Sequence, residues 1–443
     1  MSFFLFKLYL FLLFTRPFDL FAQSLAEYRP MLFLWVLAFV LGLFKVLSSK
    51  TFVWNGAYYR VLLAFMASIV ASKVASGWAG AAVGAISEFS STALLVVLVS
   101  MNVGDIDKLK SACLTILAAV ALTCFMSVYA YHTGFMSEEF VLQQSNGSSD
   151  LDLPVDRPAI PALDDSGAYL WRVRGAGFFN DPNDFAQAIV MALPWLWLLY
   201  RPGQWLRNLV CVIGPAALMA YAIFLTGSRG AILGGASLMV FGIRRVLGTA
   251  KTVALTVALG AVAMVAGMSG GRGFSTQEES AGERIEAWYE GILMLRSHPF
   301  LGVGYGNFRD YHTLTAHNSF VLCFAELGLV GFFFWMALLV IAFKVVSSVV
   351  NTAPEGSSDR LLASLLRASL VGYLTCAWFL SRTYQPTLYV LLTLCVASGY
   401  VARRNQLLPK SSAELTWVRS SLTSMVLAMS LVYGFIVLSR VQG

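Results

Sequence analysis

Residues 318–346 read NSFVLCFAELGLVGFFFWMALLVIAFKVV and contain only two charged side chains, Glu326 and Lys344. As a helix, a run of this length exceeds the roughly 20 residues needed to cross a hydrocarbon layer about 30 Å thick. Similar runs recur along the chain of 443 residues, which is 58% hydrophobic and 12% charged. A soluble globular protein carries about twice that charged fraction, roughly 25%. The sequence therefore predicts an all-α, polytopic integral membrane protein.

Thirteen apolar runs are candidates for transmembrane helices, and we expect about 12 of them to cross the membrane. The runs are 3–22, 31–48, 58–76, 84–103, 109–132, 185–200, 207–226, 229–245, 250–269, 318–346, 361–381, 384–402 and 418–439. The first is interrupted at Thr15-Arg16-Pro17. Because no small-residue cleavage site follows Phe14 cleanly, we expect this run to belong to the fold and not to a cleaved signal peptide.

Two long polar insertions, residues 133–184 and 270–317, interrupt the apolar runs. Together they hold 15 of the 24 acidic residues but only 7 of the 31 basic ones, which leaves 24 bases against 9 acids in the rest of the chain. Short loops enriched in Lys and Arg stay in the cytoplasm, so both insertions are expected on the outer face.

The chain then divides into five consecutive parts. These are N-terminal transmembrane helices (1–132), an outer loop (133–184), central transmembrane helices (185–269), a large outer loop with an amphipathic helix (270–317) and C-terminal transmembrane helices (318–443). The net charge of +7 fits this topology beside an anionic inner leaflet and gives no sign of nucleic-acid binding.

We predict no bound metal and no cofactor. All six cysteines fall inside apolar runs, where a thiol is a small core hydrophobe, and no His and Cys cluster has metal-ligand spacing. A glycine-rich phosphate loop of the GxxxxGK type is also absent from the sequence.

Four polar stretches lie where predicted outer loops meet apolar runs. The first, WRVRGAGFFNDPNDFA, covers residues 171–186. Asp184 or Asn183 is expected to cap a helix that starts near Phe185. Capping does not account for Arg172 and Arg174, which either anchor the chain at the interface or bind an anion.

The second stretch, LTGSRGAILG, covers residues 225–234 and predicts a turn of about four residues between two helices. Gly227 and Gly230 allow close backbone approach there. Arg229 is held in this turn with no acidic residue within ten positions. It therefore finds a partner elsewhere in the fold or binds an anionic ligand.

The third stretch, residues 283–308, reads ERIEAWYEGILMLRSHPFLGVGYGNF. Its first half has the spacing of an amphipathic helix that lies along the outer surface and begins with Arg284. The alternative is a solvated charged face, in which Glu286 and Glu290 pair with that arginine. His298-Pro299 and the glycines that follow are expected to form a turn.

The fourth stretch is TAHNSFVLCF, residues 315–324. Asn318 or Ser319 is expected to cap the helix, which leaves His317 at its positive end. The helix dipole disfavours the imidazolium there, and a neutral imidazole can act as a general base; the alternative is a histidine that simply hydrogen-bonds the loop. Glu326 is out of phase with His317 and is expected to be satisfied separately.

The motifs RGAGFFNDPNDFA, LTGSRGAILG, HPFLGVGYGNF and AHNSFVLCFAELGLVGFFFW, in this order, resemble those of the bacterial O-antigen ligases and their relatives. The relatives are the O-antigen polymerases and the protein O-oligosaccharyltransferases. The resemblance implies a membrane glycosyltransferase-like fold in the bacterial inner membrane, with the active site on the periplasmic face. It implies a donor glycan on undecaprenyl pyrophosphate and, for a ligase, a lipid A core acceptor, with no metal or nucleotide.

By the same resemblance, the family's functional arginines correspond to Arg174 and Arg229, and more loosely to Arg284. Its essential histidine corresponds to His317. Arg172, Asp184 and Asn318 are further candidates beside these motifs.

Two alternatives stay open from sequence. The first is the same chemistry with another acceptor, as in a polymerase or a protein glycosylating enzyme. The second is a transporter of lipid-linked glycans, in which the arginines only bind substrate. Against transport stand the two long outer loops and the lack of matching charge on the inner face, because alternating access needs a site reachable from both sides.

Overall fold

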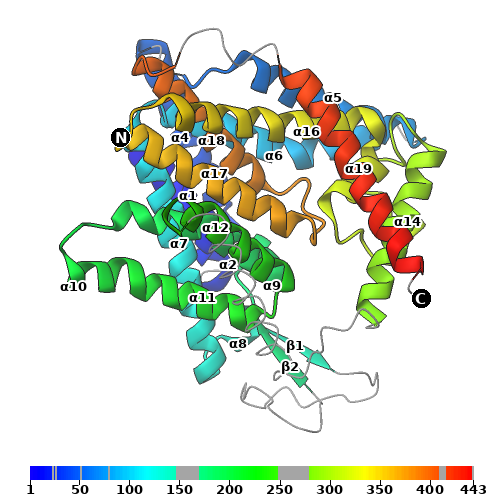
Figure 1. Ribbon diagram of the computed structural model, residues 1–443, viewed down its shortest axis with the longest axis horizontal. Coiled ribbons are helices and arrows are strands. Elements are labelled where there is room, and N and C mark those ends of the chain that lie inside the picture. The colour runs from blue at the N-terminus through cyan, green and yellow to red at the C-terminus, as the bar shows by residue number, and fades with distance from the viewer. Residues whose placement is uncertain are drawn as a thin grey trace. The chain divides into compact units, whose positions relative to one another are not determined.

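The computed structural model describes residues 1–21, 24, 27–49, 52–77, 80–145, 169–247, 279–408 and 416–441 (Figure 1). The run predicted as a helix at 250–269 lies outside these residues. Within them the secondary structure is helical apart from one two-stranded antiparallel sheet, in agreement with the predicted all-α class. The chain forms two compact units, each built from separate parts of the sequence.

The first unit comprises Met1–Phe44, Lys110–Gly273 and Val371–Cys376. Its regular elements, with the parts of α4 and α7 that it contains, are α1 (Ser2–Thr15), α2 (Pro17–Phe21), α4 (Pro30–Ser49), α7 (Ile106–Thr133), α8 (Ser137–Phe140), β1 (Val141–Ser145), β2 (Tyr169–Val173), η1 (Gly177–Phe179), α9 (Pro182–Ala192), η2 (Leu193–Leu199), α10 (Trp205–Asn208), η3 (Leu209–Ile213), α11 (Gly214–Thr226) and α12 (Arg229–Leu247).

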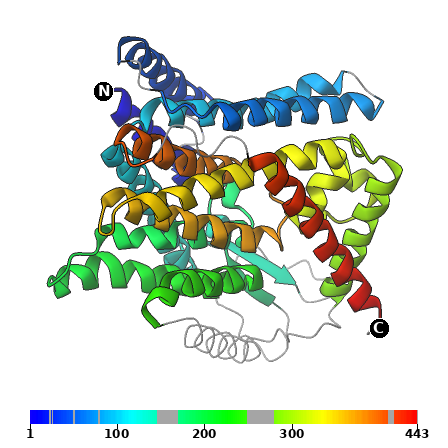
Figure 2. The same cartoon turned by 45° about the horizontal axis from the view of Figure 1, so that its top comes forward.

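The second unit comprises Lys45–Leu109, Phe274–Leu370 and Ala377–Gly443. Its helices are α5 (Gly56–Ala75), α6 (Ala81–Asn102), α14 (Glu279–Ser297), α15 (Phe308–Tyr311), α16 (Ser319–Thr352), most of α17 (Ser358–Ala377), α18 (Pro386–Arg404) and α19 (Trp417–Val441). Helix α16 is central to this unit, since it packs against α5, α14, α18 and α19. Helices α14 and α19 lie side by side (Figure 2).

Nine helices in the described ranges are long and apolar enough to cross a membrane. They are Pro30–Ser48, Gly56–Ala75, Ala81–Asn102, Ile106–Thr133, Trp205–Thr226, Ser319–Thr352, Ser358–Ala377, Pro386–Arg404 and Trp417–Ser439. Many of their large apolar side chains are exposed, as expected of side chains that face lipid. The chain is therefore a multi-pass helical membrane protein, and the count of about 12 crossings stays a prediction.

Two predicted runs are shorter helices than expected. The run 3–22 breaks at Arg16, which takes a left-handed conformation with φ 51° and ends α1 before Pro17 starts α2. Proline has no N–H to donate and its ring excludes the preceding turn, so the helix stops there. The run 185–200 is the 11-residue helix α9 followed by a 3₁₀ helix that begins just before Pro194.

The apolar run 318–346 also contains a break that its hydropathy does not reveal. Gly328 has φ 64° and ψ −167°, so α16 consists of two helical parts joined at this residue. The break leaves backbone N–H and C=O groups without helical partners, and lipid offers them no hydrogen bonds. Residues 299–304 satisfy them: the amides of Leu329 and Val330 donate to Pro299 O and Phe300 O, and the amides of Val303 and Gly304 donate to Ala325 O and Glu326 O, at 2.8–3.2 Å.

Two glycines make this joint possible. A Cβ on Gly328 would lie 2.4 Å from the carbonyl carbon of Phe300, and a Cβ on Gly302 would lie 2.3 Å from that of Glu326. Both residues have positive φ, which side chains disfavour. The loop before α16 and the break within it therefore form one interlocked structure.

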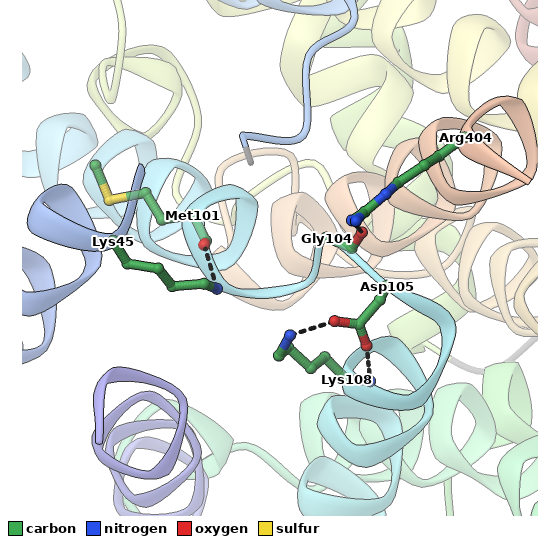
Figure 3. A network of polar contacts seen from close by, with 6 residues as sticks. All are labelled: Lys45, Met101, Gly104, Asp105, Lys108 and Arg404. Carbon is green, nitrogen blue, oxygen red and sulfur yellow. Dashed lines mark hydrogen bonds and ion pairs between the residues drawn. The ribbon is translucent and has the colours of Figure 1, made fainter. Parts of the chain in front are cut away.

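Basic residues near the ends of α4 and α18 and at the start of α7 gather around the α6–α7 turn of the second unit (Figure 3). Lys45 Nζ donates to Met101 O at 3.3 Å, and Arg404 donates to Gly104 O at 3.1 Å. Asp105 pairs with the Lys108 ammonium and accepts from the Lys108 amide at 2.9 Å. Although partial burial raises the pKa of Asp105, these bonds to Lys108 hold it below its usual value. The bases thus mark one end of the unit.

Candidate functional site

In the first unit, Arg172 joins two of the sequence motifs. It lies on β2, opposite Leu142 of β1. Its Nε donates to Thr226 O at 2.6 Å, and its Nη2 donates to Asn183 Oδ1 at 3.0 Å. The guanidinium therefore connects the end of α11 with the first turn of α9. The sequence cannot show long-range hydrogen bonds of this kind. It therefore left open whether Arg172 anchors the chain at the interface or binds an anion.

The start of α9 corrects the predicted cap. Asp181, and not Asp184 or Asn183, is the N-cap residue, and its side chain accepts from the Asn183 amide at 2.7 Å. Pro182 is the first helical residue, a position that proline favours because its missing N–H has no helical partner. The helix starts three residues earlier than predicted, so Asp184 lies buried in the first turn at the positive end of the dipole.

The turn between α11 and α12 is as short as predicted. Gly227 ends α11 with φ 59°, Ser228 follows, and Arg229 is the first residue of α12. A Cβ on Gly227 would lie 3.5 Å from Arg172 Nε, so the two motifs are in close contact here. Arg229 is a cation at the positive end of a helix, where the dipole favours an anion close by.

Arg174 follows β2 and contacts the end of α8. Its Nε donates to Glu139 O at 3.1 Å and its Nη2 to Glu138 O at 2.6 Å. Its backbone is held as well, since its amide donates to Phe140 O at 2.8 Å and its carbonyl accepts from Ser127 Oγ at 2.7 Å. Burial lowers the pKa of Arg174 and Glu139 opposes the shift, but an arginine stays charged at neutral pH. A guanidinium has five N–H donors, so two carbonyl bonds leave capacity for a phosphate oxygen.

The sequence interpretation missed Arg16 as a contact of the first motif. Its side chain pairs with Asp19 at 3.2 Å, and its guanidinium lies 5.8 Å from the Phe178 ring centre. A Cβ on Gly177 would lie 2.6 Å from Arg16 Cγ, so this glycine makes room for the arginine. The signal in the sequence was the helix break at Thr15-Arg16-Pro17, a charged residue inside an apolar run.

In the second unit, His317 has a left-handed backbone with φ 47°. This conformation is uncommon for any residue except glycine and is often found at functional sites. The next residue, Asn318, is the N-cap of α16, and its Oδ1 accepts from the amides of Phe320 and Val321 at 2.8 and 3.1 Å. These bonds confirm the first of the two predicted caps, and Asn318 is fully buried. His317 therefore lies at the positive end of a helix with its backbone direction fixed.

The connection between α17 and α18 holds this helix start in place. Four hydrogen bonds join residues 315–319 to residues 380–383: Thr315 Oγ1 to Ser381 Oγ at 2.9 Å, Ser319 Oγ to Leu380 O at 2.5 Å, the Arg382 amide to Ser319 Oγ at 2.9 Å, and Thr383 Oγ1 to Ser319 O at 2.7 Å. The hydroxyl of Ser319 thus donates one bond and accepts another. None of the partners in residues 380–383 was a candidate from sequence, because more than 60 residues separate them from residues 315–319.

Glu326 is satisfied separately from His317, as predicted. It is 3% exposed, and its two carboxylate oxygens accept from the Phe308 amide at 3.3 Å and from the Tyr384 hydroxyl at 2.8 Å. Burial, reinforced by this carboxylate, raises the pKa of Tyr384, so the residue remains a hydroxyl donor. The Tyr384 ring also meets the Tyr305 ring edge to face, with centres 4.6 Å apart. Glu326 therefore links the glycine-rich loop to the α17–α18 connection.

Arg284 lies in the second turn of α14, partly exposed. A helix is present here, as predicted, but it begins at Glu279 and not at Arg284, and Trp288 on its buried face contacts Trp378 and Phe435. Its predicted place along the outer surface stays a prediction. His298 follows α14 in the turn predicted there and is exposed, with its Nδ1 3.0 Å from Ser297 Oγ. It stays a prediction that Arg284 and His317 act in one site with Arg174 and Arg229.

A family model described as O-antigen ligase matches residues 214–336, from the start of α11 into the second part of α16. The match contains Arg229, Arg284 and His317, whereas Arg172, Arg174 and Asp184 lie before it. A search of curated proteins finds no match to the chain. The match agrees with the resemblance of the three motifs that lie inside this range: the chain is a multi-pass membrane protein whose residues 214–336 are similar to the O-antigen ligase family.

Proposed function

We propose that this protein is an O-antigen ligase, which moves polysaccharide from undecaprenyl pyrophosphate to a hydroxyl of the lipid A core on the periplasmic face of the inner membrane. The observation that carries the proposal is the backbone of His317, which is left-handed next to a buried N-cap inside the family match. The positive end of a helix dipole disfavours an imidazolium, and a neutral imidazole is the form that a general base requires.

In the proposed reaction, His317 takes the proton of the acceptor hydroxyl as its oxygen attacks the anomeric carbon. The bond from that carbon to the pyrophosphate oxygen breaks, and the configuration inverts in a single displacement. Arg174, Arg229 and Arg284 hold the pyrophosphate and offset the negative charge that grows on it as it leaves. We propose no metal and no nucleotide in this reaction.

The other candidate residues have supporting parts in the proposal. Arg172 fixes the turn that carries Arg229, because it bonds the last carbonyl of α11. Asn318 fixes the helix start behind His317. Asp184 places a carboxylate at the buried start of α9, the helix whose Asn183 also accepts from Arg172.

The direction of α18 supports the proposed orientation of the protein in the membrane. Its first residue, Pro386, follows the connection that is bonded to Ser319, and its last residue, Arg404, donates to Gly104 among the gathered bases. A helix of 19 residues spans about 28 Å, close to the thickness of the hydrocarbon layer. If the bases lie in the cytoplasm, as the positive-inside rule favours, His317 lies on the periplasmic side.

A transfer assay with purified protein tests the function. The full-length chain in detergent is incubated with a polysaccharide on undecaprenyl pyrophosphate and with one of three acceptors: lipid A core, a second lipid-linked chain or a protein. We expect transfer to the lipid A core. Growth of the lipid-linked chain would instead identify a polymerase, glycosylated protein would identify an oligosaccharyltransferase, and no transfer to any acceptor would favour the transporter.

A deletion strain gives an independent reading of the same question. Loss of a ligase leaves finished polymer on the carrier lipid and none on the core. Loss of a polymerase leaves single repeat units on the core, and that result would contradict the proposal.

A further inference from the structure

Arg382 lies in the short connection 378–385 between two helices that are each long and apolar enough to cross a membrane. It is the one charged residue in the sequence between Arg367 and Arg403. An arginine beside apolar membrane segments either anchors the chain at the interface or binds an anion. None of the four sequence motifs includes this arginine.

The backbone of Arg382 is fixed beside the candidate base. Its amide donates to Ser319 Oγ at 2.9 Å, and Ser319 comes two residues after His317. The flanking residues hold it from both sides, because Leu380 O accepts from Ser319 Oγ and Thr383 Oγ1 donates to Ser319 O. Ser319 and Thr383 are both fully buried. Water therefore does not compete for these bonds, and the Cα of Arg382 has a defined place at the start of α16.

A second set of bonds makes the connection rigid. The Tyr384 hydroxyl donates to Glu326 at 2.8 Å, and the Tyr389 hydroxyl donates to Thr383 O at 3.0 Å. Residues 382–384 are thus tied to both ends of the first part of α16. A binding group acts well when such supporting bonds already hold it in position.

The surroundings of this position favour an anion. The start of α16 is the positive end of a helix dipole, which favours an anion close by. The Nδ2 of Asn318 is buried and has no acceptor among the residues that the structure describes, while its Oδ1 is occupied by the helix amides. A buried N–H donor without an acceptor is costly, and an oxygen of a ligand would satisfy it.

We propose that Arg382 is a further substrate-binding residue, which holds the diphosphate of the lipid-linked donor beside His317. The proposal rests on the proposed function for the identity of that diphosphate. A phospholipid headgroup offers the same phosphate chemistry, and the experiment separates the two. A guanidinium suits this place because its paired donors match phosphate oxygens and its charge does not depend on pH.

The test uses full-length protein in nanodiscs made of phosphatidylcholine, with Arg382→Gln, Arg382→Lys and the control Arg309→Gln. Arg309 is an exposed arginine of the same unit. We expect kcat/KM for the donor to fall roughly 10-fold to 100-fold in Arg382→Gln, the range for a lost bond between charged groups. Arg382→Lys keeps a charge without the paired donors, so we expect a smaller loss. The KM for the acceptor stays unchanged in all three.

Donor kcat/KM within about twofold of wild type in Arg382→Gln, with His317→Ala inactive, would overturn the proposal. An effect that appears only in nanodiscs with anionic phosphatidylglycerol would also overturn it, because Arg382 would then contact headgroups. If Arg382→Gln does not fold, Arg382→Lys takes its place in the test. Wild-type kinetics in that variant would then contradict the proposal.

A binding measurement separates this proposal from the proposed function. Millimolar inorganic pyrophosphate is expected to raise the thermal unfolding midpoint of wild type, Arg309→Gln and His317→Ala, and to raise that of Arg382→Gln by less. Equal stabilisation of wild type and Arg382→Gln would reject the arginine as a ligand. If pyrophosphate stabilises wild type more than Arg382→Gln and the protein transfers glycan to no acceptor, the result would support Arg382 as a pyrophosphate ligand and reject the ligase function.

Discussion

At the scale of single residues, position 317 combines chemistry with an unusual backbone. The sequence predicted a neutral imidazole at a helix start, and the structure adds that this residue has φ 47° ahead of a buried cap. The cap and the separate satisfaction of Glu326 could be predicted because both depend on neighbours in sequence or on helix phase. The roles of Ser319, Thr383 and Arg382 could not, since their bonds join distant parts of the chain.

Replacing the candidate base should remove most of the activity. We expect His317→Ala to lower the rate of transfer by about 100-fold to 10,000-fold, the usual contribution of a general base. The rate is measured with saturating donor and acceptor in detergent. His298→Ala is the matched control, because His298 is an exposed histidine in the turn after α14. Normal lipid A capping by His317→Ala, or equal losses in both variants, would show that His317 is not the base.

The hydrogen bond between Tyr384 and Glu326 should contribute measurably to the free energy of unfolding. Tyr384→Phe leaves a buried carboxylate oxygen without its hydroxyl donor, which costs about 1–3 kcal/mol of unfolding free energy. Tyr311→Phe removes an exposed hydroxyl and should be close to neutral. In a double-mutant cycle, Tyr384→Phe and Glu326→Gln should not be additive. Additive losses would mean that the two side chains do not act as a pair.

At the scale of elements, the sequence predicted where helices lie better than where they break. The runs 58–76, 84–103 and 384–402 match α5, α6 and α18 within a few residues. The break at Gly328 was not predicted, because hydropathy is continuous through it and the cause is a loop that docks from elsewhere. The first turn of α9 was also misplaced, since two acidic residues there compete for the cap and the proline at 182 decides between them.

The break in α16 gives a prediction at this scale. Gly328→Ala forces a Cβ to within 2.4 Å of Phe300 in a backbone region that only glycine adopts easily. We expect a loss of about 3 kcal/mol or more in unfolding free energy. Thermal unfolding in detergent measures it, with Gly434→Ala as the control, since a Cβ on that helical glycine meets nothing within 4 Å. Equal midpoints for the two variants would show that the joint is not under this constraint.

At the scale of the whole molecule, composition alone predicted a helical membrane protein and the family motifs predicted its relatives. The predicted orientation in the membrane rests on charge: bases near the ends of α4 and α18 gather at the α6–α7 turn, and α18 leads from there to the connection beside His317. The distribution of the chain between two units could not be predicted, since each unit draws on distant parts of the sequence.

Labelling of single cysteines tests this orientation. Asp310 is exposed in the loop before α16, and the side chain of Glu355 is 90% exposed in the turn after it. A membrane-impermeant maleimide should label Asp310→Cys in intact spheroplasts and Glu355→Cys only after the membrane is opened. The unchanged protein is the control for its own six thiols, of which only Cys211 is not buried. The reverse labelling pattern would invert the topology and remove the basis for a periplasmic site.

The interlocked joint in α16 also restricts how the chain can be made. Residues 299–304 leave the ribosome before the carbonyl and amide groups that they satisfy at 325–330. Because lipid offers those groups no hydrogen bonds, α16 cannot settle in the bilayer as an independent segment. The preceding loop must therefore reach its place first, so a delay in that step leaves a newly synthesised helix with backbone N–H and C=O groups that lack hydrogen-bond partners, a target for membrane quality control.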